Sequence, residues 1–250
     1  MMKPDARHIE EVALNAWPGL QTLIYDGWLL RFANGYTKRA NSVVPLDTGT
    51  RPLEEKIAYC ERAYQQQKQP VIFRLPAFVE GVDELDAVLA ARGYQHLDET
   101  IVQVSDLGQA GYTQPDRAYD LLYPDHWLPM YHRMERGRTD SETHERILQA
   151  IMNPTCYIAI IDGQNVACGL GVCERGYVGL FDIVTDPAHR QRGYGMDVVQ
   201  SLLAWGQETC DADYAYLQVM ANNAPALNLY HKFGFEEGYR YWYRSLTVSS

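Results

Sequence analysis

Hydrophobic and polar residues follow one pattern twice along the chain. Each copy begins with a strand rich in β-branched or aromatic residues, and continues with an amphipathic helix, a second strand, a short helix, a Gly-aromatic pair and a last strand. The Gly-aromatic pairs are Gly93-Tyr94 and Gly234-Phe235. The corresponding segments are 40–46 and 179–185, 53–67 and 196–207, 70–75 and 214–220, and 85–104 and 226–245. This order predicts two α/β units in tandem, each a mixed sheet flanked by helices.

A polar stretch at 105–117, with Gly, Pro, Asp and Gln, separates the two copies. Such a composition is typical of a linker. We therefore predict one domain at 1–107, a linker at 108–117 and a second domain at 118–250.

The second predicted domain opens with a helix pair and a hairpin. The helices are predicted at 125–135 and 142–152, and Thr139 forms a capping box with Glu142 at the start of the second. Two strands follow at 157–162 and 165–173, and the Asp162-Gly163 turn between them predicts a hairpin.

Composition limits the classes of protein to which the chain can belong. Apolar residues make up 46% and charged residues 22% of the 250 residues, as in ordinary globular proteins. Apolar runs such as 156–161 are too short to cross a bilayer, and the first residues lack the apolar stretch of a secretory signal. We therefore expect a cytoplasmic protein without a membrane partner.

The charge of the chain bears on its partners. The 22 Lys and Arg residues stand against 32 Asp and Glu residues, which gives a formal net charge of −10. Such a chain repels a phosphate backbone, so no nucleic-acid partner is expected, and it weakly favours a cationic small substrate. The five cysteines include no C-x-x-C pair, which argues against a disulfide framework or a zinc site, and we predict no metal.

The segment between 179–185 and the helix at 196–207 has the chemistry of an anion site. Residues 190–196 form a glycine-containing turn that ends at a helix N-terminus, where backbone N–H groups and the helix dipole attract negative charge. Arg190 and Arg192 add full positive charges. A plain surface turn with solvated arginines is the alternative. The turn is not a dinucleotide fingerprint, because position 198 is valine, and it lacks the Gly-Lys-Ser/Thr of a Walker A loop.

A second segment, 217–235, combines a strand, an Asn-Asn turn and a short helix. Together the two segments resemble the GCN5-related N-acetyltransferase (GNAT) superfamily. The family pattern Arg/Gln-x-x-Gly-x-Gly/Ala is matched by Arg190, Gly193 and Gly195. The later pattern Asn-x-x-Ala-x-x-Leu-Tyr-x-Lys-x-Gly-Phe is matched by Asn223, Ala226, Leu229, Tyr230, Lys232, Gly234 and Phe235. The resemblance is specific over about 115–245 and is limited to the order of elements over 1–105.

The resemblance implies a GNAT fold and transfer of an acetyl group from acetyl-CoA to an amine. Backbone groups of Ile183, Val184 and Thr185 would pair with the pantetheine arm and polarise the thioester carbonyl. The pyrophosphate would be bound by the loop residues Arg190, Gln191, Arg192, Gly193, Tyr194 and Gly195, with Met196 at the helix start. The resemblance further implies that Asn223 contacts the pantetheine and that Tyr230 faces the coenzyme sulfur and protonates the departing thiolate.

An amine attacks a thioester only when it is neutral, yet an alkylamine with a pKa of about 10.4 is almost fully protonated at pH 7. A base must remove a proton, which is typically worth about 10²–10⁴-fold in rate. Asp182, on the strand beside the thioester, is the predicted base, and Glu174 on the preceding strand is less favoured. Structural interpretations remain open: Tyr230 as a core residue, Asp182 as a local cap or ion pair, Asn223 as a helix N-cap and His189 as a loop residue.

The first copy departs from the family pattern where the chemistry would lie. Leu89 stands at the position of Tyr230, and Val82 at that of Asn223. Its counterpart of the phosphate loop, 46–52, has one glycine and no net charge. We therefore predict a degenerate, non-catalytic copy that supports the acceptor pocket.

The polar and aromatic run 25–41 has two interpretations. It could line the acceptor pocket through Trp28, Arg31, Tyr36, Lys38 and Arg39. It could instead form two exposed edge strands of a hairpin with Asn34-Gly35 as its turn.

The predicted function is acetyl transfer from acetyl-CoA to a primary amine of a small molecule, by direct attack on the thioester. Acceptor contacts are expected from the helix pair, at Tyr131, Arg133, Glu135 and Arg138. Transfer to a protein lysine is one alternative. A non-catalytic module that binds acyl-CoA and docks a partner is another, although such a module needs neither the Tyr230 acid nor the Asp182 base. The oligomeric state does not follow from the sequence, which is compatible with a homodimer.

Overall fold

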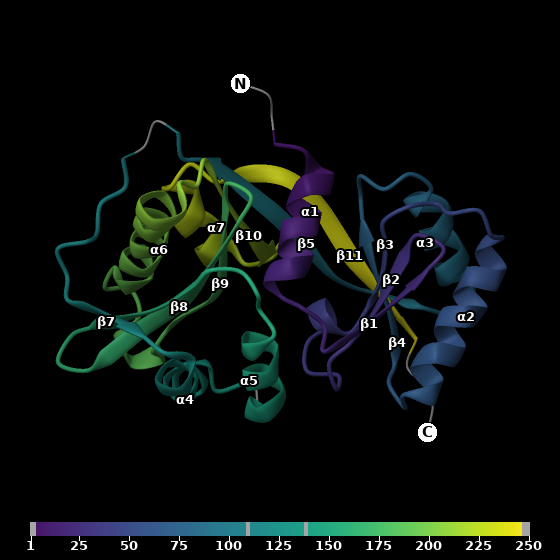
Figure 1. Cartoon of the computed structure of the whole chain (residues 1–250), viewed down its shortest axis with the longest axis horizontal. Coiled ribbons are helices and arrows are strands. Elements are labelled where there is room, and N and C mark those ends of the chain that lie inside the picture. The colour runs from purple at the N-terminus through teal and green to yellow at the C-terminus, as the bar shows by residue number, and fades with distance from the viewer. Residues whose placement is uncertain (1–3, 109–110, 138–139, 247–250) are drawn as a thin grey trace. The chain divides into compact units, whose positions relative to one another are not determined.

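The computed structural model describes residues 4–108, 111–137 and 140–246, which divide into two compact units (Figure 1). The first unit comprises Met1–Ala16 and Val102–Gly238, and the second comprises Trp17–Ile101 and Tyr239–Ser250. These units differ from the predicted segments 1–107 and 118–250. The predicted boundary follows the repeat in the sequence, whereas each compact unit contains chain from both copies.

The first unit is a mixed sheet with helices. Its elements in chain order are α1 (Ala6–Ala16), β5 (Gln95–Asp106, from Val102 on), β6 (Tyr119–Leu122), α4 (Pro124–Glu135), α5 (Ser141–Gln149), β7 (Thr155–Ile161), β8 (Asn165–Glu174), β9 (Tyr177–Thr185), the 3-10 turn η2 (Pro187–His189), α6 (Tyr194–Cys210), β10 (Tyr214–Met220) and α7 (Ala224–His231). The strand order is β5-β10-β9-β8-β7-β6. Successive strands from β6 to β9 are antiparallel, and β9 and β10 are parallel.

The predicted helix pair and hairpin are confirmed as α4, α5 and the β7–β8 pair, with two local differences. The N-cap of α5 is Asp140, whose carboxylate accepts a hydrogen bond from the Thr143 amide at 2.9 Å. Thr139, the predicted cap, lies outside the described residues. Helix α5 ends at Gln149 rather than at 152, with Ala150 as its C-cap.

Glycines bring α6 close to the sheet beneath it. One face of α6, formed by Val199, Leu202, Leu203 and Gly206, is buried. A Cβ added at Gly206 would lie 2.8 Å from a side-chain carbon of Val178 on β9, and one at Gly169 would lie 2.6 Å from Val198. Because only glycine fits these contacts, the helix is held directly over β8 and β9, and its N-terminus starts where β9 ends.

The second unit has its own core, and its strands belong to the same 11-stranded sheet as those of the first unit. Its elements are β1 (Gln21–Tyr25), β2 (Trp28–Phe32), the 3-10 turn η1 (Lys38–Ala40), β3 (Val43–Pro45), α2 (Leu53–Gln66), β4 (Val71–Pro76), α3 (Val82–Ala91), the first part of β5, and β11 (Glu236–Leu246) from Tyr239 on. The strand order is β1-β2-β3-β4-β11-β5. Trp28, Ile57, Tyr64, Phe73 and Leu89 belong to one buried cluster in which α2 and α3 meet the sheet.

The predicted repeat is confirmed in the order of elements. The series β3-α2-β4-α3-β5 corresponds to β9-α6-β10-α7-β11, and the first and third elements of each series are parallel strands. The backbone is left-handed at both Gly93 (φ 87°) and Gly234 (φ 72°), as only glycine adopts readily. The last strands are exchanged, because β11 pairs with β4 of the first copy, whereas β5 neighbours β10 of the second copy.

The hairpin considered for 25–41 was given the wrong turn, Asn34-Gly35. Strands β1 and β2 do form a hairpin, but its turn is Asp26-Gly27, with φ values of 46° and 83°. Positive φ at both central residues suits a two-residue hairpin turn. Asn34 and Gly35 also have positive φ, but they lie after β2, on the way to η1. In the described ranges, no helix combines the length and apolar character needed to cross a membrane.

Candidate active site

The start of α6 presents backbone amides to open space. Gly193 is the N-cap with φ 88°, Gln191 also has a positive φ of 62°, and Arg190 and Arg192 are exposed. The Met196 amide donates to the Gly193 carbonyl at 2.8 Å, so the amides before it precede the first intrahelical hydrogen bond. Among the residues that the structure describes, none has an atom within 4 Å of a Cβ added at Gly193. The loop therefore fits the diphosphate of a coenzyme, by amides, helix dipole and two arginines.

Tyr194 anchors this loop instead of facing outward. Its side chain is buried, its hydroxyl donates to the Asp162 carboxylate in the β7–β8 turn, and the Arg117 guanidinium lies 4.6 Å from its ring centroid. Arg117 also pairs with Asp197 of α6 at 2.7 Å. Only the backbone of Tyr194 is therefore placed to contact a phosphate.

Strand β9 carries a bulge next to the loop. Cys168 of β8 pairs with Val184, but Leu170 pairs with Phe181, so one residue of β8, Gly169, opposes two of β9. Asp182 lies in this bulge with φ 45°. A bulge frees backbone groups from the ladder and re-aims side chains. The sequence predicted a regular strand here; it gives no signal for the bulge beyond the tolerance of Asp for left-handed backbone.

The parallel register between β9 and β10 ends before the bulge. It runs from Tyr177 and Tyr214 to Leu180 and Leu217. Beyond it β9 continues through Thr185 and β10 through Met220. The predicted backbone contacts of Ile183 to Thr185 thus lie on the part of β9 that extends past this register, where the residues are half-buried.

Two helices bind the carboxylate of Asp182. The Tyr131 hydroxyl of α4 donates to Asp182 Oδ1 at 3.2 Å, and His144 Nε2 of α5 lies 3.0 Å from Oδ2. His144 Nδ1 lies 3.3 Å from Nε2 of His132 on α4. The side chains of His144 and Asp182 expose only 0% and 2% of their surface. The predicted base is therefore buried among donors from the predicted acceptor helices.

The two histidines are functional candidates that sequence reasoning missed. His144 lies on the buried face of α5 with Thr143, Ile147 and Leu148. A histidine on the apolar face of an amphipathic helix was the available signal, because a buried imidazole needs hydrogen-bond partners. His132 follows Tyr131 directly and is half-buried.

Glu174, the less favoured base, contacts residues outside the β9 bulge. Its carboxylate accepts from Asn15 and Asn153, each at 3.0 Å, and pairs with Arg175 at 3.1 Å. Its Cα partner in the ladder is Tyr177, at the opposite end of β9 from Thr185.

Helix α7 brings the second motif against the first. Asn223 is its N-cap and accepts from the Ala226 amide at 3.3 Å. A Cβ added at Gly195 of α6 would lie 3.5 Å from Leu229, so the first turn of α6 packs beside α7. The Tyr230 ring is half-buried and meets Phe235 edge-on at 5.9 Å, and burial raises the pKa of Tyr230 to about 12.

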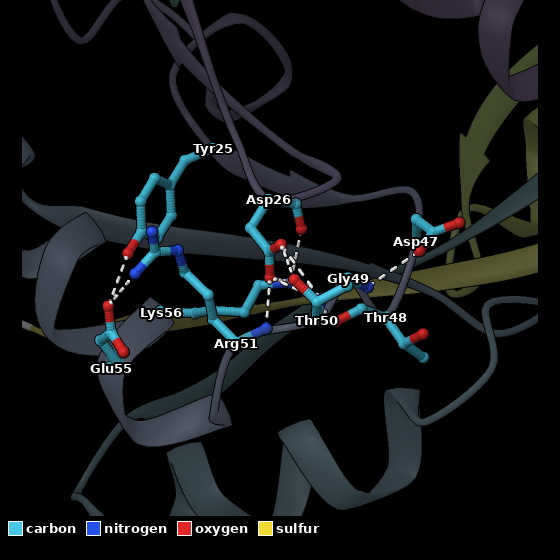
Figure 2. Close-up of polar contacts among 9 residues, drawn as sticks. All are labelled: Tyr25, Asp26, Asp47, Thr48, Gly49, Thr50, Arg51, Glu55 and Lys56. Atoms are coloured by element: carbon cyan, nitrogen blue, oxygen red, sulfur yellow. Dashed lines mark hydrogen bonds and ion pairs between the residues drawn. The ribbon is translucent and has the colours of Figure 1, made fainter.

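In the first copy, the counterpart of the phosphate loop is filled by the protein itself (Figure 2). The Asp26 carboxylate accepts from the amides of Thr50 and Arg51, each at 3.0 Å, at the start of α2, and lies 3.2 Å from the buried Lys56 ammonium. A Cβ added at Gly49 would lie only 2.2 Å from the carboxylate, so glycine permits this approach. Chiefly because of the Arg51 and Thr50 amides, the pKa of Asp26 is well below its usual range.

The residues predicted to line a pocket in 25–41 serve internal contacts. Trp28 and Arg31 are buried, and the Arg31 guanidinium donates to the Trp17 and Arg39 carbonyls. Lys38 pairs with Asp98 at 2.6 Å, and the Arg39 guanidinium lies 4.9 Å from the centre of the Trp17 ring. Tyr36 is half-buried, with its hydroxyl oxygen covered. The structure therefore does not bring these five residues together around an open pocket.

The remaining candidates on and near α4 also contact backbone or neighbours. Arg133 donates to the Asn165 carbonyl at 3.3 Å, and Glu135 accepts from the Gly137 amide at 2.8 Å. Arg138 lies outside the described residues. His189 Nδ1 lies 3.7 Å from the Asp186 carboxylate, beside the loop. Of the predicted acceptor residues that the structure describes, Tyr131 contacts the bulge residue Asp182.

Known sequences resemble the chain along most of its length. The family described as "Probable histone acetyltransferase Rv0428c C-terminal" matches residues 4–244. "Uncharacterized N-acetyltransferase YobR" of Bacillus subtilis is 29% identical over 252 residues, covering 96% of this chain and 98% of that protein. "Probable histone acetyltransferase Rv0428c" of Mycobacterium tuberculosis is 34% identical over 131 residues, covering 51% of this chain and 38% of that protein.

Solved structures share the fold. "GCN5-related N-acetyltransferase from Kribbella flavida" has a TM-score of 0.75 at 13% identity, with 98% of this chain and 96% of that chain covered. A "Tandem GNAT protein from the clavulanic acid biosynthesis pathway" has a TM-score of 0.66 at 12% identity, with 100% and 91% covered. The fold is thus the mixed α/β fold of tandem GNAT structures. With the family match over residues 4–244, the chain belongs to the Rv0428c C-terminal family, within the GCN5-related N-acetyltransferase superfamily of acetyl-CoA-dependent enzymes.

Proposed function

We propose that the chain transfers an acetyl group from acetyl-CoA to a primary amine of a small molecule. The observation that supports this most directly is the convergence of three features in the first unit. The open N-terminus of α6 follows the bulged end of β9, and α7 with Tyr230 packs against the first turn of α6. Phosphate binding, thioester polarisation and proton transfer can therefore be served by neighbouring elements.

The residues of the loop would hold the coenzyme. Amides of Gly193, Tyr194 and Gly195 donate to the diphosphate, and Arg190 and Arg192 neutralise its charge. The backbone of Ile183, Val184 and Thr185 pairs with the pantetheine arm, and Asn223 contacts it from the start of α7. When bound, acetyl-CoA supplies the acetyl group.

Two side chains carry the proton transfers in this proposal. Asp182 accepts the proton of the attacking amine, directly or through one water molecule, and the amides freed by the bulge stabilise the negative charge on the reacting carbonyl oxygen. Tyr230 donates a proton to the departing sulfur. Its raised pKa of about 12 keeps the phenol protonated at neutral pH, as a general acid requires.

Two properties support an amine as the acceptor. The formal net charge of −10 favours a cationic acceptor over an anionic one. Relatives are described as a probable histone acetyltransferase in Mycobacterium tuberculosis and as N-alpha-acetyltransferases in Sulfurisphaera tokodaii and Sulfolobus acidocaldarius. A protein lysine is therefore the competing acceptor.

We further propose that the first copy does not take part in catalysis. The amides that correspond to the phosphate loop are occupied by Asp26 (Figure 2), and Leu89 and Val82 replace the tyrosine and asparagine of the second copy. The predicted division into a degenerate copy at 1–107 and a catalytic copy at 118–250 remains our proposal for function.

The test is a thiol-release assay of the purified chain with acetyl-CoA and amines, amino acids, polyamines or a lysine peptide. Tyr230→Phe is compared with Tyr123→Phe, a matched change at a tyrosine that is 78% exposed. We expect turnover on a small amine and at least a tenfold loss of kcat in Tyr230→Phe alone. Turnover on the peptide alone would assign a protein acceptor. Coenzyme binding without turnover on any acceptor would favour the non-catalytic module.

A further inference from the structure

The carboxylate proposed as the base is the inner end of a chain of closely spaced polar side chains from α4 and α5. We propose that His144 and His132 are positioning residues for Asp182: His144 holds its carboxylate ionised and aimed, and His132 fixes the tautomer of His144. This inference rests on the proposed role of Asp182 as the base. The chain runs from Asp182 in the β9 bulge to His144 on α5 and then to His132 on α4.

Donor and acceptor roles along this chain follow from its innermost member. An ionised carboxylate can only accept hydrogen bonds. Oδ1 of Asp182 accepts a hydrogen bond from the Tyr131 hydroxyl, and Oδ2 lies 3.0 Å from His144 Nε2 in a close contact that lacks hydrogen-bond alignment. Because a protonated Nε2 is attracted to an ionised carboxylate at this distance and a bare lone pair is repelled, we assign the proton of His144 to Nε2. Nδ1 of a neutral His144 is then an acceptor, and the donor 3.3 Å away is the Nε2–H of His132. This arrangement of protons makes the Tyr131 and His132 contacts hydrogen bonds and the contact between His144 and Asp182 an electrostatic attraction.

Burial makes these donors necessary. The Asp182 side chain exposes 2% of its surface, and an isolated carboxylate at such a site favours its neutral form. The titratable or charged groups around it are Tyr131, His132 and Arg133 of α4, His144 of α5, Tyr157 of β7 and Cys168 of β8. Of these, Tyr131 places its hydroxyl oxygen 3.2 Å from the carboxylate and His144 places its Nε2 at 3.0 Å.

The backbone of Asp182 explains why aiming also matters. The residue sits at φ 45° in a bulge, so neighbouring strand pairing does not fix its side chain as it would in a regular ladder. Contacts from two helices replace that restraint. Without them the carboxylate loses both its orientation and its preferred charge, although the loop at Gly193 is untouched.

The test compares His144→Phe, which keeps ring shape without a donor, with His144→Gln, which restores an N–H donor. The measurement is the pH dependence of kcat/KM, with the Kd for acetyl-CoA and thermal unfolding as controls. We expect His144→Phe to move the acidic limb upward by about one pH unit or more and to lower kcat about tenfold, at unchanged coenzyme affinity. His144→Gln should recover part of both effects. An unmoved limb in a folded His144→Phe variant would overturn the inference.

A measurement on the unmodified chain keeps the inference testable if His144→Phe does not fold. ¹⁵N NMR of histidine-labelled protein distinguishes the two neutral tautomers, and we expect His144 to carry its proton on Nε2. Loss of that tautomer preference in His132→Phe is the second expected result. A proton on Nδ1 of His144 would overturn the inference. Asp182→Asn separates it from the proposed function: unchanged turnover in that variant removes the base itself, whichever way the histidines behave.

Discussion

Replacing Gly193 by glutamate tests the proposed phosphate loop most directly. In the described part of the chain, no atom lies within 4 Å of the new Cβ, but the φ of 88° costs an L-residue about 1–2 kcal/mol. A carboxylate about 5 Å from one phosphate charge adds about 0.8 kcal/mol at a dielectric constant of 80 and about 3.3 kcal/mol at 20. The charge alone therefore weakens acetyl-CoA binding by about fourfold to about 200-fold.

The assay is isothermal titration of acetyl-CoA into Gly193→Glu and Gly193→Ala. The alanine variant carries the same backbone strain without the charge, so the ratio of the two Kd values isolates the electrostatic part. That ratio should shrink as salt rises, because salt screens exposed charges. Equal Kd values for the two variants and the unmodified chain would refute the assignment of the loop to the coenzyme.

Other predictions concern stability and pH. The pKa of Asp26 is lowered in the folded chain, so its ionised carboxylate stabilises the fold above the ordinary carboxyl pKa, and this effect is lost as the pH falls below that value. The Tm difference between the unmodified chain and Asp26→Asn should therefore shrink from pH 6 to pH 2.5. A constant difference would contradict this. Gly49→Ala, which clashes with Asp26, should lower the Tm more than Gly35→Ala, which has a similar φ but no atom within 4 Å. Leu202→Ala should cost about 2–5 kcal/mol in urea unfolding, because Leu202 is fully buried against β8, and a cost below 1 kcal/mol would contradict that packing. With the Tyr230 pKa near 12, kcat should not decline between pH 7 and about 10, and a decline there that disappears in Tyr230→Phe would remove the acid role.

The order of elements could be predicted because local patterns carry it. The Gly-aromatic pairs at 93 and 234, the amphipathic face of α6 and the Asp162-Gly163 turn each depend on residues close in sequence. Local patterns do not show which distant segments pair as neighbouring strands. Asp26-Gly27 and Asn34-Gly35 have the same turn chemistry, and only the pairing of β1 with β2 decides which of them joins the hairpin. The exchange of β5 and β11 could not be predicted either, because it also depends on pairing between distant strands.

In the candidate site, too, the features set by short motifs could be predicted and those set by distant contacts could not. The loop at 190–196 and the Tyr230 helix were predictable, because their chemistry lies in short motifs. The bulge at Asp182 depends on the register between two strands, and the carboxylate's partners come from helices α4 and α5, far away in sequence. His144 could be placed beside Asp182 only once the helices were packed on the sheet.

The exchange of β5 and β11 bears on how the chain can be divided. A cut within 108–117 would give two fragments, each lacking the strand next to its own parallel pair, since β4 is completed by β11 and β10 by β5. Neither fragment would then close its sheet, and each would expose a row of unpaired amides and carbonyls. Deleting the first copy would therefore remove the strand β5 that lies next to β10 of the second copy. The second copy thus depends on the first for its sheet, whatever chemistry the first copy has lost.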